Sequence, residues 1–252
     1  MSLPVRERSP RRGGGRHRRP VPTSLPPDAP VLVLVCPGGV DGVAEDIAAV
    51  VRVDNPQIEL RLCTVTDLTG SLPEERDCVV VPLLVWDDPE ILAEIGKAVA
   101  GHEGAVVTDA LGPHPLMAEA LHIRLAERGL ARADRVRLLN VNSPVDAVIL
   151  ATLGGEQAVI SAQPTAVLLA ARLTLPVVAA SLDSEPGVKV AAERLRAAGA
   201  ERLAIAPCVL ETPDDLLEQA AESIKAGHAA PLGAHGAMAE LVARAYGSQL
   251  AT

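Results

Sequence analysis

The chain has 252 residues, 48% hydrophobic and 22% charged, which suits one large globular domain or two small ones and excludes a mainly disordered protein. Phe is absent and Trp and Tyr occur once each, so stacking on nucleic-acid bases is nearly unavailable. Seven Arg and one Glu give residues 1–20 a charge of +6, and the remaining 16 basic and 31 acidic side chains give the rest −15, for a net charge of −9. An acidic body repels a phosphate backbone, so we do not expect a nucleic-acid partner.

The first 29 residues are rich in Arg and Pro and contain no apolar run like that of a secretory signal. We therefore expect residues 1–29 to be a disordered tail. No stretch reaches the roughly 18 uninterrupted apolar residues of a membrane span, so no membrane contact is expected. The four cysteines show no CxxC pairing, which favours a reducing, cytoplasmic location.

From residue 31 onward, short apolar runs alternate with helical patterns. In the first half, strands are predicted at 31–35, 58–63, 78–84 and 105–108, and helices at about 43–53, 89–100 and 115–129. In the second half, strands are predicted at 147–151 and 203–207, and an amphipathic helix at 185–198. Continuous β-branched runs separated by helices are typical of a parallel sheet covered on both faces, so the predicted class is α/β.

One nine-residue motif occurs twice. Leu111–Glu119 recurs as Leu232–Glu240, with six of nine residues identical at an offset of 121. The first strands of the two halves, 31–35 and 147–151, also correspond, and each runs into a pair of glycines. A repeat of this kind indicates a duplicated structural unit.

The repeat predicts two tandem similar lobes, residues 30–140 and 141–252, each a roughly four-stranded parallel sheet flanked by helices. The copies are unequal. Residues 185–198 supply a helix between the second and third strands of the second lobe, whereas the equivalent residues 64–77 of the first have room for little more than a turn.

Ligands of open α/β sheets bind beyond the carboxyl ends of the strands, so the site is expected in the segments that follow the strands. These segments are residues 36–41, 86–90 and 109–114 in the first lobe and 152–156, 208–214 and 231–235 in the second. Glycines such as Gly38 and Gly39 let the backbone approach a ligand closely. No segment matches a P-loop or a GxGxxG fingerprint, so no nucleotide cofactor is expected.

Two histidines, His114 and His235, stand in the repeated motif where a helix is predicted to begin. Each is either the cap of that helix or a base or ligand at the mouth of a cleft. Their duplication favours the structural role, because an asymmetric site seldom needs the same catalytic residue twice.

Asp88-Pro89-Glu90 follows the third predicted strand of the first lobe. The three residues form either an ordinary helix start, with Asp88 as N-cap, or part of a carboxylate site for a hard metal. Trp86 either flanks an aromatic ligand or packs in the interior. Cys36, at the end of the first strand, is either a soft metal ligand or a small buried residue.

Together these features resemble the sirohydrochlorin chelatases. The resemblance is carried by LGPHPLMAEAL at 111–121, its echo at 231–235, the run VVVPLL at 79–84 and the two-lobed repeat, and it covers residues 31–247. These are small class II chelatases, related to the cobaltochelatases of cobalamin synthesis, in the two-lobe form seen in actinobacteria. The resemblance implies a lyase of siroheme or cobalamin biosynthesis that inserts Fe²⁺ or Co²⁺ into a sirohydrochlorin-like tetrapyrrole in the cleft between lobes, without ATP.

Members of that family hold the metal with two histidines of one lobe, one after the first strand and one after the third. In this chain both positions differ. The register anchored by Asp41 puts Pro37 at the first position, beside Cys36, and Glu90 stands at the second. Proline has no ligating side chain, so a conserved metal site is not expected.

A substitute set of residues is predicted in place of the two histidines. The predicted metal ligands are Cys36, Asp88 and Glu90, the predicted catalytic groups are Glu90 and His114, and the predicted tetrapyrrole contacts are Gly38, Gly39, Trp86 and His235. Two functions remain open for the cleft: an active chelatase with altered ligands, or a catalytically degenerate relative that binds a tetrapyrrole or metal as carrier, sensor or partner subunit. A nucleic-acid contact made by the Arg-rich residues 1–20 is a third, least favoured hypothesis. Nothing in the sequence fixes the oligomeric state.

Overall fold

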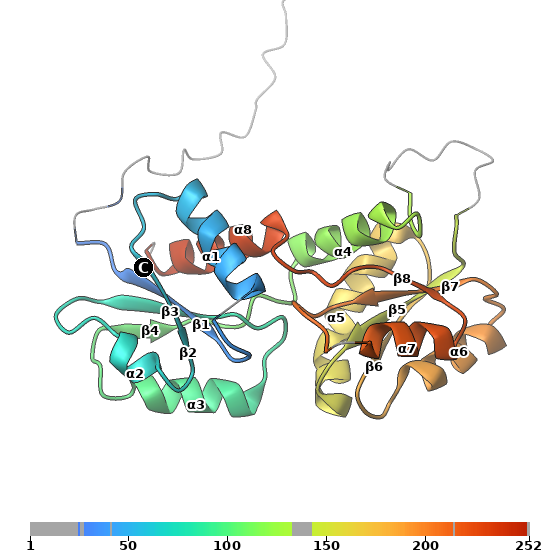
Figure 1. The fold of residues 1–252 in the computed structure, drawn as a ribbon, viewed down its shortest axis with the longest axis horizontal. Helices are drawn as coiled ribbons and strands as arrows, with labels where there is room; N and C mark the ends of the chain where they lie inside the picture. The colour runs from blue at the N-terminus through green and yellow to red at the C-terminus, as the bar shows by residue number, and fades with distance from the viewer. Residues whose placement is uncertain (1–24, 26–27, 41, 133–142, 214, 251–252) are drawn as a thin grey trace, which may run out of the picture.

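The computed structural model describes residues 25, 28–40, 42–132, 143–213 and 215–250. These residues form two four-stranded parallel sheets, one in each half of the sequence (Figure 1). The first sheet has the strand order β2-β1-β3-β4 and the second β6-β5-β7-β8, so the two halves share one topology. The predicted α/β fold with two similar lobes is confirmed.

The strands are β1 (Val31–Cys36), β2 (Leu60–Thr64), β3 (Cys78–Pro82), β4 (Ala105–Val107), β5 (Ala147–Thr152), β6 (Val177–Ser181), β7 (Leu203–Pro207) and β8 (Gly227–His228). The helices are α1 (Val43–Asp54), α2 (Leu68–Ser71), α3 (Pro89–Val99), α4 (Pro115–Glu127), α5 (Gly155–Leu173), α6 (Val188–Ala197), α7 (Leu216–Ser223) and α8 (Gly236–Gln249). Every predicted strand and helix is found, shifted by a few residues at its ends. No predicted range corresponds to β6, β8, α2, α5, α7 or α8, although a helix start was predicted at His235.

The central strand of each sheet is buried along its whole length. All six residues of β1 and all six of β5 are buried, as expected for parallel strands with helices on both faces. Because side chains alternate along a strand, Val33 packs toward α2 and α3 whereas Leu32 and Leu34 pack toward α1. The continuous apolar runs of the sequence are therefore explained by burial on two sides.

The last helix of each half covers the sheet of the other half. Helix α8, from the end of the chain, packs on α1 and β3 in the first lobe, and α4 packs on α5 and β7 in the second (Figure 1). Met117 and Leu121 of α4, and Met238 and Val242 of α8, are fully buried in one cluster that includes strands of both sheets. One continuous hydrophobic cluster thus joins the two lobes.

The connection between the second and third strands differs between the lobes, as predicted. It contains only the four-residue α2 in the first lobe but the ten-residue α6 in the second. Most of the predicted tail, the predicted lobe boundary at 140–141 and Asp41 lie outside the described residues. Over the ranges that are described, none of the helices has the length and apolar character needed to cross a membrane.

Candidate functional site

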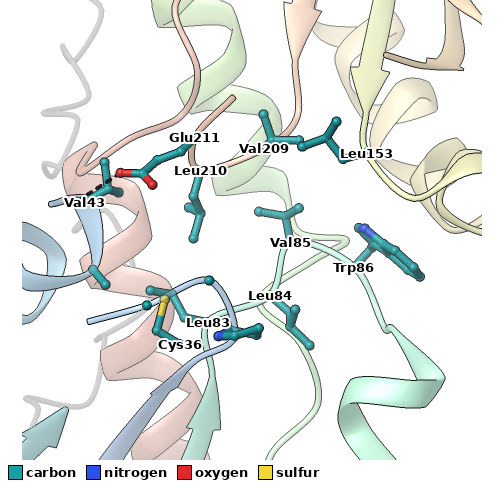
Figure 2. A pocket seen from close by; sticks show the side chains of 14 residues that line it. Cys36, Val43, Leu83, Leu84, Val85, Trp86, Leu153, Val209, Leu210 and Glu211 are labelled. Atoms are coloured by element: carbon teal, nitrogen blue, oxygen red, sulfur yellow. Dashed lines mark hydrogen bonds between the residues drawn. The ribbon is translucent and has the colours of Figure 1, made fainter. Parts of the chain in front are cut away.

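A cavity of about 240 Å³ lies where the carboxyl ends of β1 and β3 face the second lobe (Figure 2). The first lobe contributes the end of β1 with the following loop, the start of α1, and the segment after β3. The second lobe contributes residues that follow β5 and β7. The lining residues are Cys36, Pro37, Gly38, Gly39, Val43, Ala44, Leu83, Leu84, Val85, Trp86, Leu153, Val209, Leu210 and Glu211.

Four of the predicted site residues line this cavity together. Cys36 is the last residue of β1, Gly38 and Gly39 form the loop that follows it, and Trp86 follows β3. They come together because β1 and β3 are neighbouring parallel strands whose carboxyl ends meet at one edge of the sheet. The structure thus places them where a ligand of the cleft would lie, and their ligand contacts remain predictions.

Asp88 and Glu90 are placed differently. The Asp88 carboxylate accepts hydrogen bonds from the backbone N–H groups of Glu90 at 3.0 Å and Ile91 at 3.2 Å, and Pro89 occupies the first turn of α3. Asp88 is therefore the N-cap of α3, and the capping interpretation of this segment holds. The exposed Glu90 does not line the cavity.

The described part of the chain contains no group of three or more His, Cys, Asp or Glu side chains arranged to hold a metal ion. Cys36, Asp88 and Glu90 are all described, and the structure does not assemble them into one ligand set. The equivalent segment of the second lobe also differs from α3. Asp215 is the N-cap residue of α7 and has a φ of 61°, but its side chain makes no capping hydrogen bond.

The two repeated histidines cap helices. His114 Nδ1 accepts a hydrogen bond from Leu116 N at 3.0 Å at the start of α4, and His235 Nδ1 accepts one from Ala237 N at 3.1 Å at the start of α8. Burial lowers the pKa of both imidazoles, and a facing arginine lowers it further, Arg244 beside His114 and Arg124 beside His235. The structural interpretation of both histidines is confirmed.

His114 faces a second cavity, of about 370 Å³, between the loop after β4 and the end of α8. Its polar lining residues are Asp87, Thr108, Asp109, His114, Arg244, Ser248 and Gln249. Asp87 is fixed there by a hydrogen bond from Ala110 N at 3.1 Å. His114 and Trp86 therefore belong to different cavities, and His235 lines neither.

Glu211 is a cavity residue that no sequence motif identifies. It follows β7, and its carboxylate accepts a hydrogen bond from Val43 N of the first lobe at 3.2 Å (Figure 2). The rule that ligands bind after strands includes it within segment 208–214, but nothing in that segment distinguishes it from its neighbours. Its partner lies 168 residues away in the sequence, which no local pattern reveals.

In the second lobe, the glycine that Trp86 contacts is held by a small polar network. Gly154 N donates to the Asp183 carboxylate at 3.3 Å, and Ser181 Oγ donates to the same carboxylate at 2.5 Å. Burial raises the pKa of Asp183, but the hydrogen bonds from Ser181, Gly154 and Ser184 outweigh it and lower the pKa. Asp183 stays ionised and fixes the loop on which Trp86 packs.

The cavity is chemically a mainly apolar slot. Most of its lining is aliphatic, with one indole, one thiol, one carboxylate and a glycine loop. Aliphatic walls and an indole suit a flat conjugated ligand, and a thiol and a carboxylate are both groups that bind divalent metals.

No protein-family model and no curated protein matches the chain. Among solved structures, the sirohydrochlorin chelatase SirB from Bacillus subtilis subspecies spizizenii, in complex with cobalt, is similar over 87% of this chain and 94% of that chain, with a TM-score of 0.63 and 13% identity. A putative LacI transcriptional regulator from Bacteroides fragilis matches 78% of this chain and 74% of that chain at 11% identity, with a TM-score of only 0.38. The chain therefore has a chelatase-like fold.

Proposed function

We propose that this protein binds a sirohydrochlorin-like tetrapyrrole at the cavity between its lobes and inserts Fe²⁺ or Co²⁺ into it. The observation that carries the proposal is a cavity lined by both lobes, at the carboxyl ends of parallel strands, on a chelatase-like fold. The similar SirB structure is a sirohydrochlorin chelatase crystallised with cobalt, which supports a divalent metal as the second substrate.

Metal insertion needs a group that holds the ion and groups that accept the two pyrrole protons. Cys36 and Glu211 line the cavity and offer a thiol and a carboxylate for these tasks. Trp86 offers an aromatic face to the ring. Glu90 and His114, which we predicted as catalytic from the sequence, lie outside this lining, so we assign them no part in the reaction.

A second candidate is a relative that binds the tetrapyrrole without inserting metal. The observation that favours it is that no group of three metal-ligating side chains is found over the described ranges. Two cavity groups alone can bind an ion only if the ring or water completes the coordination shell.

A spectroscopic titration of the purified protein distinguishes the two candidates. Sirohydrochlorin is added with and without Fe²⁺ or Co²⁺, and both the bound pigment and the metallated product are followed by absorbance. We expect saturable binding and insertion faster than the spontaneous reaction. Binding without accelerated insertion would establish the second candidate, and no saturable binding would overturn both.

Cysteine variants test the site within the same assay. Cys36→Ser is expected to lower the insertion rate by tenfold or more, a loss typical for removal of a reacting group (~10²–10⁴-fold for a general acid or base). Cys63→Ser is the matched control, because Cys63 is a buried cysteine of β2 outside the cavity lining. Equal rates for the two variants would remove Cys36 from the reaction.

The cytoplasm is the proposed location, supported by four buried cysteines.

A further inference from the structure

Two of the contacts between the lobes lie at the two ends of the cavity. At one, the Glu211 carboxylate of the second lobe accepts a hydrogen bond from Val43 N of the first at 3.2 Å. At the other, the Trp86 indole of the first lobe packs against Gly154 of the second. Glu211 lies beside Val43 at one end of the cavity and Trp86 lies at the other (Figure 2). The two contacts therefore bracket the space that a ligand would enter.

The Glu211 contact replaces a helix cap that α1 lacks. Gly42 is the N-cap residue of α1, and no side chain of its own segment caps the helix. A carboxylate is favourable at the positive end of a helix, and Glu211 supplies it from the other lobe. Glu211 is exposed to solvent, so water can replace this hydrogen bond at little cost. The contact is suited to reversible breaking.

The Trp86 contact depends on a glycine. Gly154 has a φ of +105°, and a Cβ at this position would lie 3.0 Å from Trp86 Cζ2. Only a residue without a side chain lets the ring approach the backbone so closely in this conformation.

The cavity is small while both contacts are formed. Its volume of about 240 Å³ is below the roughly 300–1,000 Å³ of pockets that enclose drug-sized ligands. Helices α4 and α8, with the hydrophobic cluster that they share, join the lobes independently of these two contacts. Both contacts can therefore break while the lobes stay attached.

We propose that Trp86 and Glu211 form a two-point latch that holds the lobes closed over the cavity, and that a ligand enters from an open form in which both contacts are broken. The latch rests on the proposed function for the identity of its ligand. The closed form itself needs no ligand, since both contacts are made within the chain.

The distance between the lobes tests the latch with no ligand present. Spin labels are attached after Lys97→Cys on α3 and Lys189→Cys on α6, two exposed positions in different lobes, and double electron–electron resonance measures their separation. The native cysteines are buried, and the chain without the two changes is the labelling control. We expect the Trp86→Ala/Glu211→Ala variant to shift the distribution to longer distances and broaden it.

The matched control is Trp86→Phe/Glu218→Ala, which keeps an aromatic ring near Gly154 and removes an exposed carboxylate of α7 instead. It should retain the distribution of the unmodified chain. The same distribution in the alanine variant and in the unmodified chain would overturn the latch.

Stopped-flow mixing with sirohydrochlorin then tests the coupling to entry. If the open form is populated to about 10% in the unmodified chain, Glu211→Ala raises the association rate constant by up to about tenfold, and Glu218→Ala leaves it unchanged. A distance shift in the alanine variant, together with no sirohydrochlorin binding to the unmodified chain, would refute the proposed function and leave the latch standing. An unchanged association rate constant despite a distance shift would refute the role of the latch in ligand entry.

Discussion

His114 and His235 each cap the helix that crosses to the other lobe. The cap uses the lone pair on Nδ1, so it forms only while the imidazole is neutral. We call α4 and α8 the exchanged helices, because each covers the sheet of the other half. Burial favours the neutral ring, and so does an arginine from the other exchanged helix, Arg244 of α8 beside His114 and Arg124 of α4 beside His235. The two exchanged helices thus hold each other's capping histidine uncharged.

Stability should therefore fall in mild acid. Because folding lowers the pKa of both histidines, the unfolded chain binds more protons below a pH of about 6.5. The stabilisation is complete above that pH and is lost as the pH falls from about 6.5 toward the lower folded pKa values. We expect urea midpoints to drop between pH 7.5 and 5.5, and to drop less in His114→Asn/His235→Asn, since Asn caps a helix without titrating.

His228→Asn is the control for this measurement, since His228 caps no helix. It should keep the pH dependence of the unmodified chain. A double variant with an undiminished drop would contradict the capping role.

Asp88 offers a direct choice between a cap and a metal ligand. Asp88→Ala should lower the free energy of unfolding by about 1 kcal/mol, because two backbone N–H groups of α3 lose their acceptor. Asp88→Asn keeps an acceptor and should stay within a few tenths of a kcal/mol of the unmodified chain. Both changes in the free energy of unfolding are to be measured by urea unfolding. Stabilisation by Co²⁺ that disappears in Asp88→Asn would instead indicate a metal ligand.

At the scale of elements, the local sequence pattern predicts the type and position of single strands and helices. β1 and β3 are unbroken apolar runs, and the start of α3 carries its own capping signal, so both were predictable from sequence. β8 has only two residues and α5 contains Pro164 within its length, so neither has a clear periodic signal. Local pattern also cannot reveal which sheet a helix covers, and the exchange of α4 and α8 was accordingly not predicted.

The exchange predicts where a core substitution acts. Met238 belongs to the second half of the sequence but is fully buried in α8, which packs on α1 and β3 of the first lobe. Met238→Ala should cost about 2–5 kcal/mol and should reduce amide hydrogen-exchange protection in α1. Leu217→Ala on α7, which packs within the second lobe, is the control and should leave α1 protected. Loss of protection confined to the second lobe after Met238→Ala would contradict this assignment.

For the whole molecule, the sequence predicts the duplication and the edge of the sheet where the site lies. It places Cys36, Gly38, Gly39 and Trp86 correctly at that edge, because parallel neighbouring strands end together. It does not predict the partnership of Val43 with Glu211, which depends on how the two lobes meet. It also leaves the role of the LGxH histidines open, since a cap and a base require the same residue at the same helix start.

The exchanged helices also govern how the chain must be made. During synthesis all four strands of the first sheet emerge well before α8, which occupies residues 236–249 at the end of the chain. At translation rates of ~5–20 residues per second, the surfaces of α1 and β3 that α8 covers stay open to solvent for on the order of ten seconds. The nascent first lobe is therefore expected to be prone to aggregation until α8 has been synthesised and packs on it.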